Sequence, residues 1–158
     1  MKQNKTIFFI LQFLGWLFVL LCWGLVLVHQ GQLPPTIPTH FNALGEADDY
    51  SAKSMIFLLP TLLTVLYAGL TLLSRHPQTF NYPVALTEAN KAAQQLNARY
   101  LLATIQLALA IVFTLLTYFS MRAAIMQQAF IPIWLLPLAL ALFFIPILFF
   151  VLRARKLK

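Results

Sequence analysis

The residues best suited to chemistry gather in one stretch of the chain, between positions 29 and 54. Three of the four acidic residues of the whole sequence lie there. The side chains that could contact a ligand are His40, Asn42, Glu46, Asp48, Asp49 and Lys53. Three acids against one lysine give the stretch a net charge of −2. That charge would favour a cationic ligand.

Metal binding and acid–base catalysis are two uses that this cluster could have. His40, Glu46 and Asp48 offer nitrogen and oxygen ligands, but their spacing matches no established metal-binding template. His40 beside carboxylates could act as a general acid or base, although no nucleophile motif accompanies it. A third interpretation needs no chemistry: an acidic, solvated loop in which Lys53 pairs with a carboxylate. No cofactor is predicted, and a non-enzymatic role is favoured.

The apolar runs around these residues are long enough to cross a membrane. Hydrophobic residues make up 61% of the 158 positions and charged residues 9%, unlike a soluble domain. About 20 apolar residues cross the ~30 Å hydrocarbon core, and lipid forces the backbone to bond internally as a helix. The sequence therefore predicts an all-α integral membrane protein, with a single membrane domain over residues 1–158. Its four transmembrane helices are expected at about residues 7–28, 55–73, 98–120 and 131–152.

The interior of these runs carries no ionisable side chain that would suit a proton-coupled pump. Polar residues inside the spans, such as Gln12, Gln106 and several threonines, are predicted to hydrogen-bond between helices. Cys22 is the only cysteine and lies in the first run, where it is expected to behave as a small hydrophobic residue.

Lysine and arginine placement predicts the orientation of the chain. Nine of the 11 basic residues lie in the two tails and in the segment from Arg75 to Arg99, whereas Lys53 and Arg122 lie on the other side. Because cytoplasmic connections are rich in Lys and Arg, both termini are expected in the cytoplasm and the loop at 29–54 outside. The net charge of +7 sits at the ends of apolar runs, so no nucleic-acid partner is predicted.

The inner loop, residues 74–97, is expected to be ordered. Asn81, Tyr82 and Pro83 are predicted to form a turn. Thr87 is predicted to cap a helix that begins at Glu88 and continues into the third span as a cytoplasmic amphipathic extension. The apolar stripe of that extension, expected on the membrane surface or against the bundle, is Leu86, Ala89, Ala93, Leu96 and Tyr100.

The outer loop also resembles a known family. Its pattern is carried by Pro38, His40, Asn42, Gly45, Asp48, Tyr50 and Lys53. This pattern is similar to that of a bacterial membrane domain of unknown function that forms the N-terminal part of SdpI-type immunity proteins, which protect cells against a toxic secreted peptide. The Asn81-Tyr82-Pro83 segment looks like a feature of short, stand-alone members. Asp49 and Ser51 depart from the family, which often has glycines there, and the larger C-terminal part of SdpI-type proteins has no counterpart in residues 98–158.

The resemblance implies a multi-pass protein of the bacterial cytoplasmic (inner) membrane with an immunity-like or sensing-like role. The leading hypothesis is an outer loop that recognises a ligand or partner, either a secreted peptide or another envelope protein. In that hypothesis Pro38, Gly45 and Tyr50 are structural. One alternative is a small transporter or permeability factor, and another is a metal-dependent membrane enzyme. The lipid bilayer is an expected partner, and the sequence leaves oligomerisation open.

Overall fold

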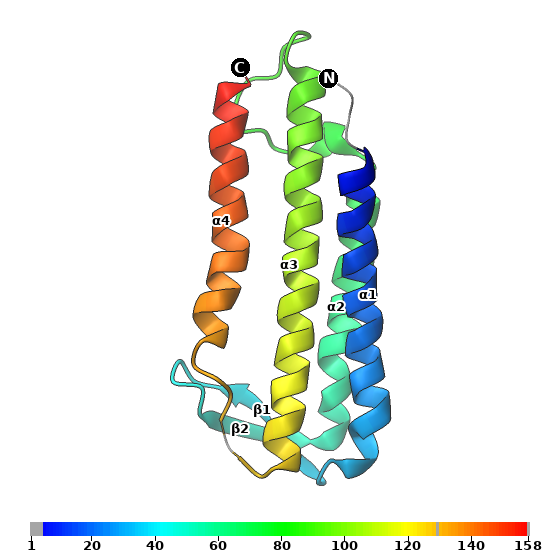
Figure 1. Cartoon of the computed structure of the whole chain (residues 1–158), viewed down its shortest axis with the longest axis vertical. Helices are drawn as coiled ribbons and strands as arrows, with labels where there is room; N and C mark the ends of the chain where they lie inside the picture. The colour runs from blue at the N-terminus through cyan, green and yellow to red at the C-terminus, as the bar shows by residue number, and fades with distance from the viewer. Residues whose placement is uncertain (1–4, 129, 158) are drawn as a thin grey trace.

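Four long helices form the body of the protein. The structure, a computed structural model, describes residues 5–128 and 130–157. The helices are α1 (Lys5–His29), α2 (Leu58–Leu73), α3 (Lys91–Ile125) and α4 (Leu135–Lys156), and they run side by side along the long axis (Figure 1). All four, α2 being extended by the turn Lys53–Phe57, are long and apolar enough to cross a membrane. The chain is thus a small multi-pass membrane protein, as predicted.

A β-hairpin fills much of the predicted outer loop, so the all-α prediction is wrong for this segment. Strand β1 (Thr36–Phe41) pairs antiparallel with β2 (Ala47–Ala52), and the register is irregular between Pro38 and Phe41. The strands were not predicted because β1 contains a proline and β2 contains two aspartates, and these residues are poor strand formers. A turn at residues 42–45 joins the two strands.

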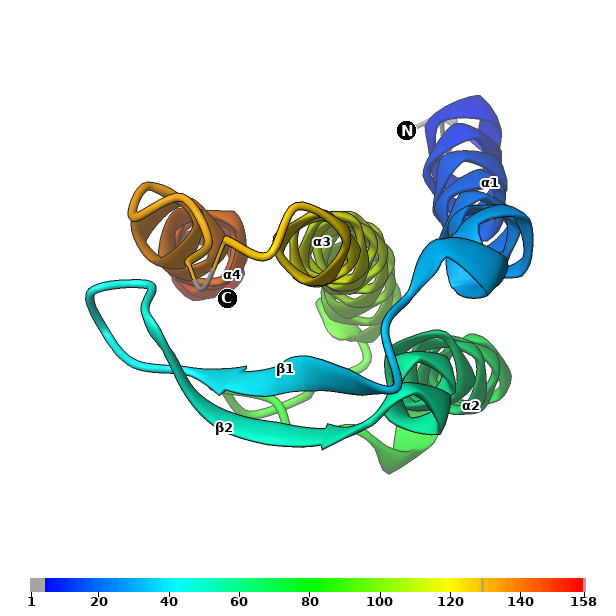
Figure 2. The ribbon, with the colours of Figure 1, turned by 90° about the horizontal axis from the view of Figure 1, so that it is seen from below.

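Helix α3 is the centre of the bundle. It contacts α1, α2 and α4, and near its C-terminal end it also contacts β1. Seen from the hairpin end, the strands run beneath α3 from α2 toward α4 (Figure 2). One apolar core there joins Val26 of α1, Ile37 of β1 and Met121 of α3. The hairpin is therefore packed against the helices and does not project freely.

The spans are tied together by polar contacts, as predicted for Gln12 and Gln106. The amide of Gln12 donates to the Gln106 side-chain oxygen at 2.7 Å, which joins α1 to α3. Gln106 in turn donates to Thr71 of α2 at 2.9 Å. Not every polar residue serves this purpose, since Thr104 donates to the carbonyl of Tyr100 within its own helix.

The extension before the third span differs from its prediction. Helix α3 begins at Lys91 and not at Glu88. The Thr87 hydroxyl accepts the Asn90 N–H at 3.3 Å, so this residue does cap the turn before the helix. Helix α3 is longer than the predicted 98–120, and α4 starts and ends four residues later than the predicted 131–152.

The buried residues of this extension are polar, whereas the residues of the predicted apolar stripe are exposed or half-buried. Gln94 and Asn97 are 1% and 5% exposed, whereas Leu86 of the predicted stripe is 40% exposed. The amide of Gln94 donates to the carbonyls of Ala154 and Leu157 at 2.8 and 3.1 Å. A helix ends with carbonyls that lack intrahelical donors. The carbonyl groups at the end of α4 therefore require amide donors from α3, which leucine side chains could not supply.

Candidate functional site

The turn of the hairpin is built around Asn42. Its side-chain oxygen accepts the backbone N–H groups of Leu44 and Glu46 at 2.9 and 3.1 Å. Its amide donates to the Glu46 carboxylate at 3.0 Å. Asparagine commonly closes turns in this way. The structure therefore gives Asn42 and Glu46, both predicted ligand contacts, a definite role in shaping the loop.

Gly45 ties this turn to the segment before α4. Its φ is +82°, a conformation that side chains rarely adopt. Its carbonyl accepts the N–H of Ile131 at 2.7 Å. A Cβ atom at this position would lie 2.4 Å from the Ile131 carbonyl oxygen. Gly45 is thus both a turn residue and a position where two backbone segments approach closely, and its place in the sequence could not reveal the second role.

His40 and Asp48 form a hydrogen bond across the hairpin. His40 Nδ1 lies 2.5 Å from Asp48 Oδ1, and the side chains are 67% and 45% exposed. A bond at Nδ1 fixes the orientation of the imidazole ring and sets which nitrogen carries the proton. With Nδ1–H donated to the carboxylate, Nε2 is left to accept a hydrogen bond. Two of the predicted ligand contacts are thus brought together.

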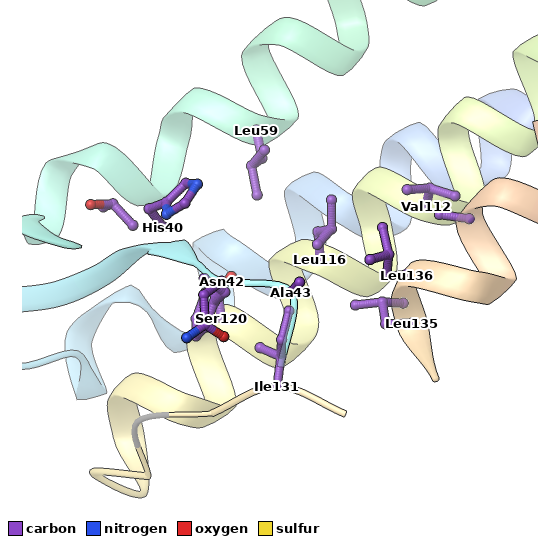
Figure 3. Close-up of a pocket in the computed structure, with 13 residues that line it drawn as sticks. His40, Asn42, Ala43, Leu59, Val112, Leu116, Ser120, Ile131, Leu135 and Leu136 are labelled. Atoms are coloured by element: carbon purple, nitrogen blue, oxygen red, sulfur yellow. The ribbon is translucent and has the colours of Figure 1, made fainter. Parts of the chain in front are cut away.

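A groove of about 560 Å³ opens beside this pair. Figure 3 shows it between α2, α3 and α4, with residues 39–43 at one end. Its apolar lining comes from the helices and, in part, from the hairpin and the segment before α4: Phe41, Ala43, Leu59, Val112, Leu116, Ile131, Leu135, Leu136 and Ala139. Its polar lining comes from Thr39, His40, Asn42 and Ser120. The groove is therefore apolar along the helices and polar where it meets the hairpin.

The remaining predicted contacts do not line this groove. Asp49 accepts the backbone N–H of Tyr50 at 2.9 Å. Lys53 donates its backbone N–H to Pro35 at 2.9 Å, which fixes the end of the hairpin. Among the described residues no carboxylate lies within ion-pair distance of Lys53, so the predicted pairing with a loop carboxylate is wrong. The carboxylate of Asp48 is hydrogen-bonded to His40 instead.

The second predicted motif lies at the opposite end of the bundle (Figure 1). The segment Asn81-Tyr82-Pro83 forms no hydrogen-bonded turn; a bend begins at Pro83. The Tyr82 hydroxyl donates to the Pro77 carbonyl at 2.6 Å. Burial raises the pKa of Tyr82 above its usual value. This motif organises the connection between α2 and α3 and takes no part in the groove.

The candidate metal ligands do not converge. Within residues 5–128 and 130–157, no group of three or more His, Cys, Asp and Glu side chains is placed to hold a metal ion. Glu46 is engaged by Asn42, while His40 is engaged by Asp48. The arrangement is suited to hydrogen bonding with a ligand.

Sequence reasoning missed most of the groove. Leu116 and Leu136 line it, yet leucines that face lipid are of the same type. Ile131 lies between two predicted elements and carries no signal of its own. Only the polar end, through His40 and Asn42, could be found from residue types.

Comparison with known proteins agrees with the resemblance of the outer loop. Residues 17–64 match a family described as a domain of unknown function (DUF1648). An uncharacterized protein of Archaeoglobus fulgidus is 31% identical over 85 residues, a match that covers 49% of this chain and 46% of the relative. The chain thus spans less than half the length of that relative, and no solved structure matches. The matched residues include the second half of α1, the hairpin and the start of α2, so this part of the chain is similar to that family.

Proposed function

We propose that this protein recognises a ligand at the hairpin end of its helical bundle, from the outer side of a bacterial cytoplasmic membrane. The observation that carries the proposal is the groove beside the His40–Asp48 pair. Ligand sites are concave and mostly apolar, with a few placed polar groups. The groove has this composition, and its volume of about 560 Å³ lies within the usual range for such sites.

The polar end of the groove is preorganised, which supports recognition. Asn42 holds the turn by three side-chain hydrogen bonds. Gly45 docks the turn onto Ile131, and Asp48 fixes the ring of His40. A site that is already ordered loses less conformational entropy when it binds.

The charge of the loop supports a cationic ligand. Glu46, Asp48 and Asp49 outnumber Lys53 in the hairpin region. Complementary charge steers encounter and discriminates against the wrong partner. A secreted peptide fits this requirement, as in an immunity or sensing role, and so does a segment of another envelope protein.

Affinity capture of the intact protein from gently solubilised native membranes tests the proposal. The comparison uses wild type, His40→Ala, Asp48→Asn and the control Gln78→Ala at matched abundance. Gln78 is an exposed polar residue in the connection between α2 and α3, away from the hairpin. A partner or ligand that is captured by wild type and Gln78→Ala, and lost with His40→Ala and Asp48→Asn, is the expected result. Equal capture by all four proteins would place any binding elsewhere and contradict the proposal.

A further inference from the structure

The groove is polar at one end only, which constrains the ligand that it fits. Along α3 it runs from Val112 to Ser120. At 1.5 Å per residue this is about 12 Å, close to the hydrocarbon thickness of one leaflet, about 15 Å. His40 and Asn42 lie at the hairpin end, whereas the walls along the helices are apolar. A molecule that matches both regions must itself be amphiphilic.

The groove has room for a single alkyl or acyl chain. Its volume is about 560 Å³, and it runs beside α3 between α2 and α4.

The polar end is suited to a hydrogen-bond donor that carries positive charge. With Nδ1–H donated to Asp48, the Nε2 atom of His40 can accept a hydrogen bond. Asp48 is 45% exposed, so its carboxylate remains accessible to a cation. Lys53 lies where β2 ends, at the other end of the hairpin from its turn. The local balance at the His40–Asp48 pair is therefore negative.

From these observations we infer that the groove binds an amphiphile with one apolar chain and an ammonium head group, taken from the surrounding leaflet. The chain lies along α3 between Leu116 and Leu136, and the ammonium group meets His40 Nε2 and the Asp48 carboxylate. This inference rests on the proposed function, because it names the ligand class for the same site.

The test uses the full-length protein in nanodiscs and n-alkylammonium ions of 8, 10 and 12 carbons. Each competes with a fluorescent alkylammonium probe, and n-alkyl sulfates of equal length serve as the comparison. The three lengths are compared at equal concentration in the leaflet, where a methylene gains little on moving from lipid into the groove. Ammonium ions are expected to compete at least tenfold more tightly than sulfates. Equal competition by both series would overturn the cationic head group.

Two variants test the place of binding. Ala139→Phe puts an aromatic ring into the groove and is expected to abolish competition. Leu116→Trp is a second blocking variant, should the first reduce folding. Leu62→Trp is the matched control, because Leu62 is 41% exposed on α2 and does not line the groove. Thermal unfolding verifies that each variant is folded. Unchanged competition in a folded blocking variant would overturn the inference.

The outcome separates this inference from the proposed function. Failure of the ammonium probes, together with His40-dependent capture of a different partner, would reject the ligand class and leave recognition standing. Failure of the probes and of His40-dependent capture would reject both. Saturable binding of the ammonium probes that is lost with Ala139→Phe would support both.

Discussion

Individual residues of the hairpin are held in place by local geometry. His40 is oriented by Asp48, and Asn42 accepts two N–H groups of its own turn. These contacts mean that one side chain can both shape the loop and present a surface to a ligand. Variants of Asn42 therefore report mainly on folding, whereas Asp48→Asn leaves the turn bonds intact and reports mainly on recognition.

Gly45→Ala is expected to detach the hairpin from the segment before α4. The left-handed backbone at Gly45 costs an L-residue about 1–2 kcal/mol, and the new Cβ would collide with the Ile131 carbonyl oxygen at 2.4 Å. Thermal unfolding and hydrogen exchange of the Ile131 N–H measure the loss. Gly31→Ala is the control, because a Cβ there meets no atom within 4 Å. An unchanged exchange rate at Ile131 would mean that the Gly45 contact does not hold the hairpin.

Tyr82 is expected to make stability depend on alkaline pH. Burial raises the pKa of its hydroxyl in the folded state, and the protonated hydroxyl donates to Pro77. A pKa above the unfolded value of about 10 means that the contribution is fully present below pH 10. It is lost as the pH rises through the folded pKa. Thermal unfolding of wild type should therefore approach that of Tyr82→Phe above this point, and a constant difference at all pH values would contradict the argument.

At the scale of elements, hydropathy and length predict the helices because lipid imposes both. The span of α1 differs from its predicted limits by one or two residues. Patterns that depend on a partner element were less visible. The strands β1 and β2 are six residues each, and they pair with one another in a two-stranded sheet. The polar face at Gln94 and Asn97 is explained only by the carbonyl groups of α4 that it contacts.

The candidate site shows the same contrast between residues that are predictable locally and residues that depend on packing. His40 and Asp48 stand out because polar residues are rare in this chain, and they do form a pair. The walls of the groove come from three helices whose spacing is a property of the packed bundle. No local signal distinguishes Leu116 in a groove from a leucine that faces lipid.

Gln94→Leu is expected to loosen the last turn of α4 more than the bundle. The change removes the donors to the carbonyls of Ala154 and Leu157. It also removes a buried side-chain oxygen that has no partner within the described chain, which offsets part of the loss in global stability. Trypsin should therefore cleave faster after Arg153 and Arg155, with little change in thermal unfolding. Gln95→Leu is the matched control on the same helix, and equal cleavage of both variants would contradict the capping role.

The orientation of the whole molecule in the membrane decides whether the groove can bind an extracellular ligand. The start of α1, the end of α4 and the connection between α2 and α3 share one end, and the hairpin lies at the other (Figure 1). Among the described residues, seven basic residues belong to segments at or near the first end, whereas Lys53 and Arg122 lie toward the hairpin end. Since basic connections stay in the cytoplasm, the hairpin is predicted to face outward.

Cysteine labelling in a Cys22→Ser background tests this orientation. Leu44→Cys places a thiol in the hairpin turn, where the native side chain is 65% exposed, and Gln78→Cys places one at the opposite end. A charged maleimide that does not cross membranes should label Leu44→Cys on intact cells, and label Gln78→Cys only after the membrane is opened. The reverse labelling pattern would show that the His40–Asp48 pair faces the cytoplasm. Recognition of a secreted ligand would then fail for geometric reasons, even with the groove intact.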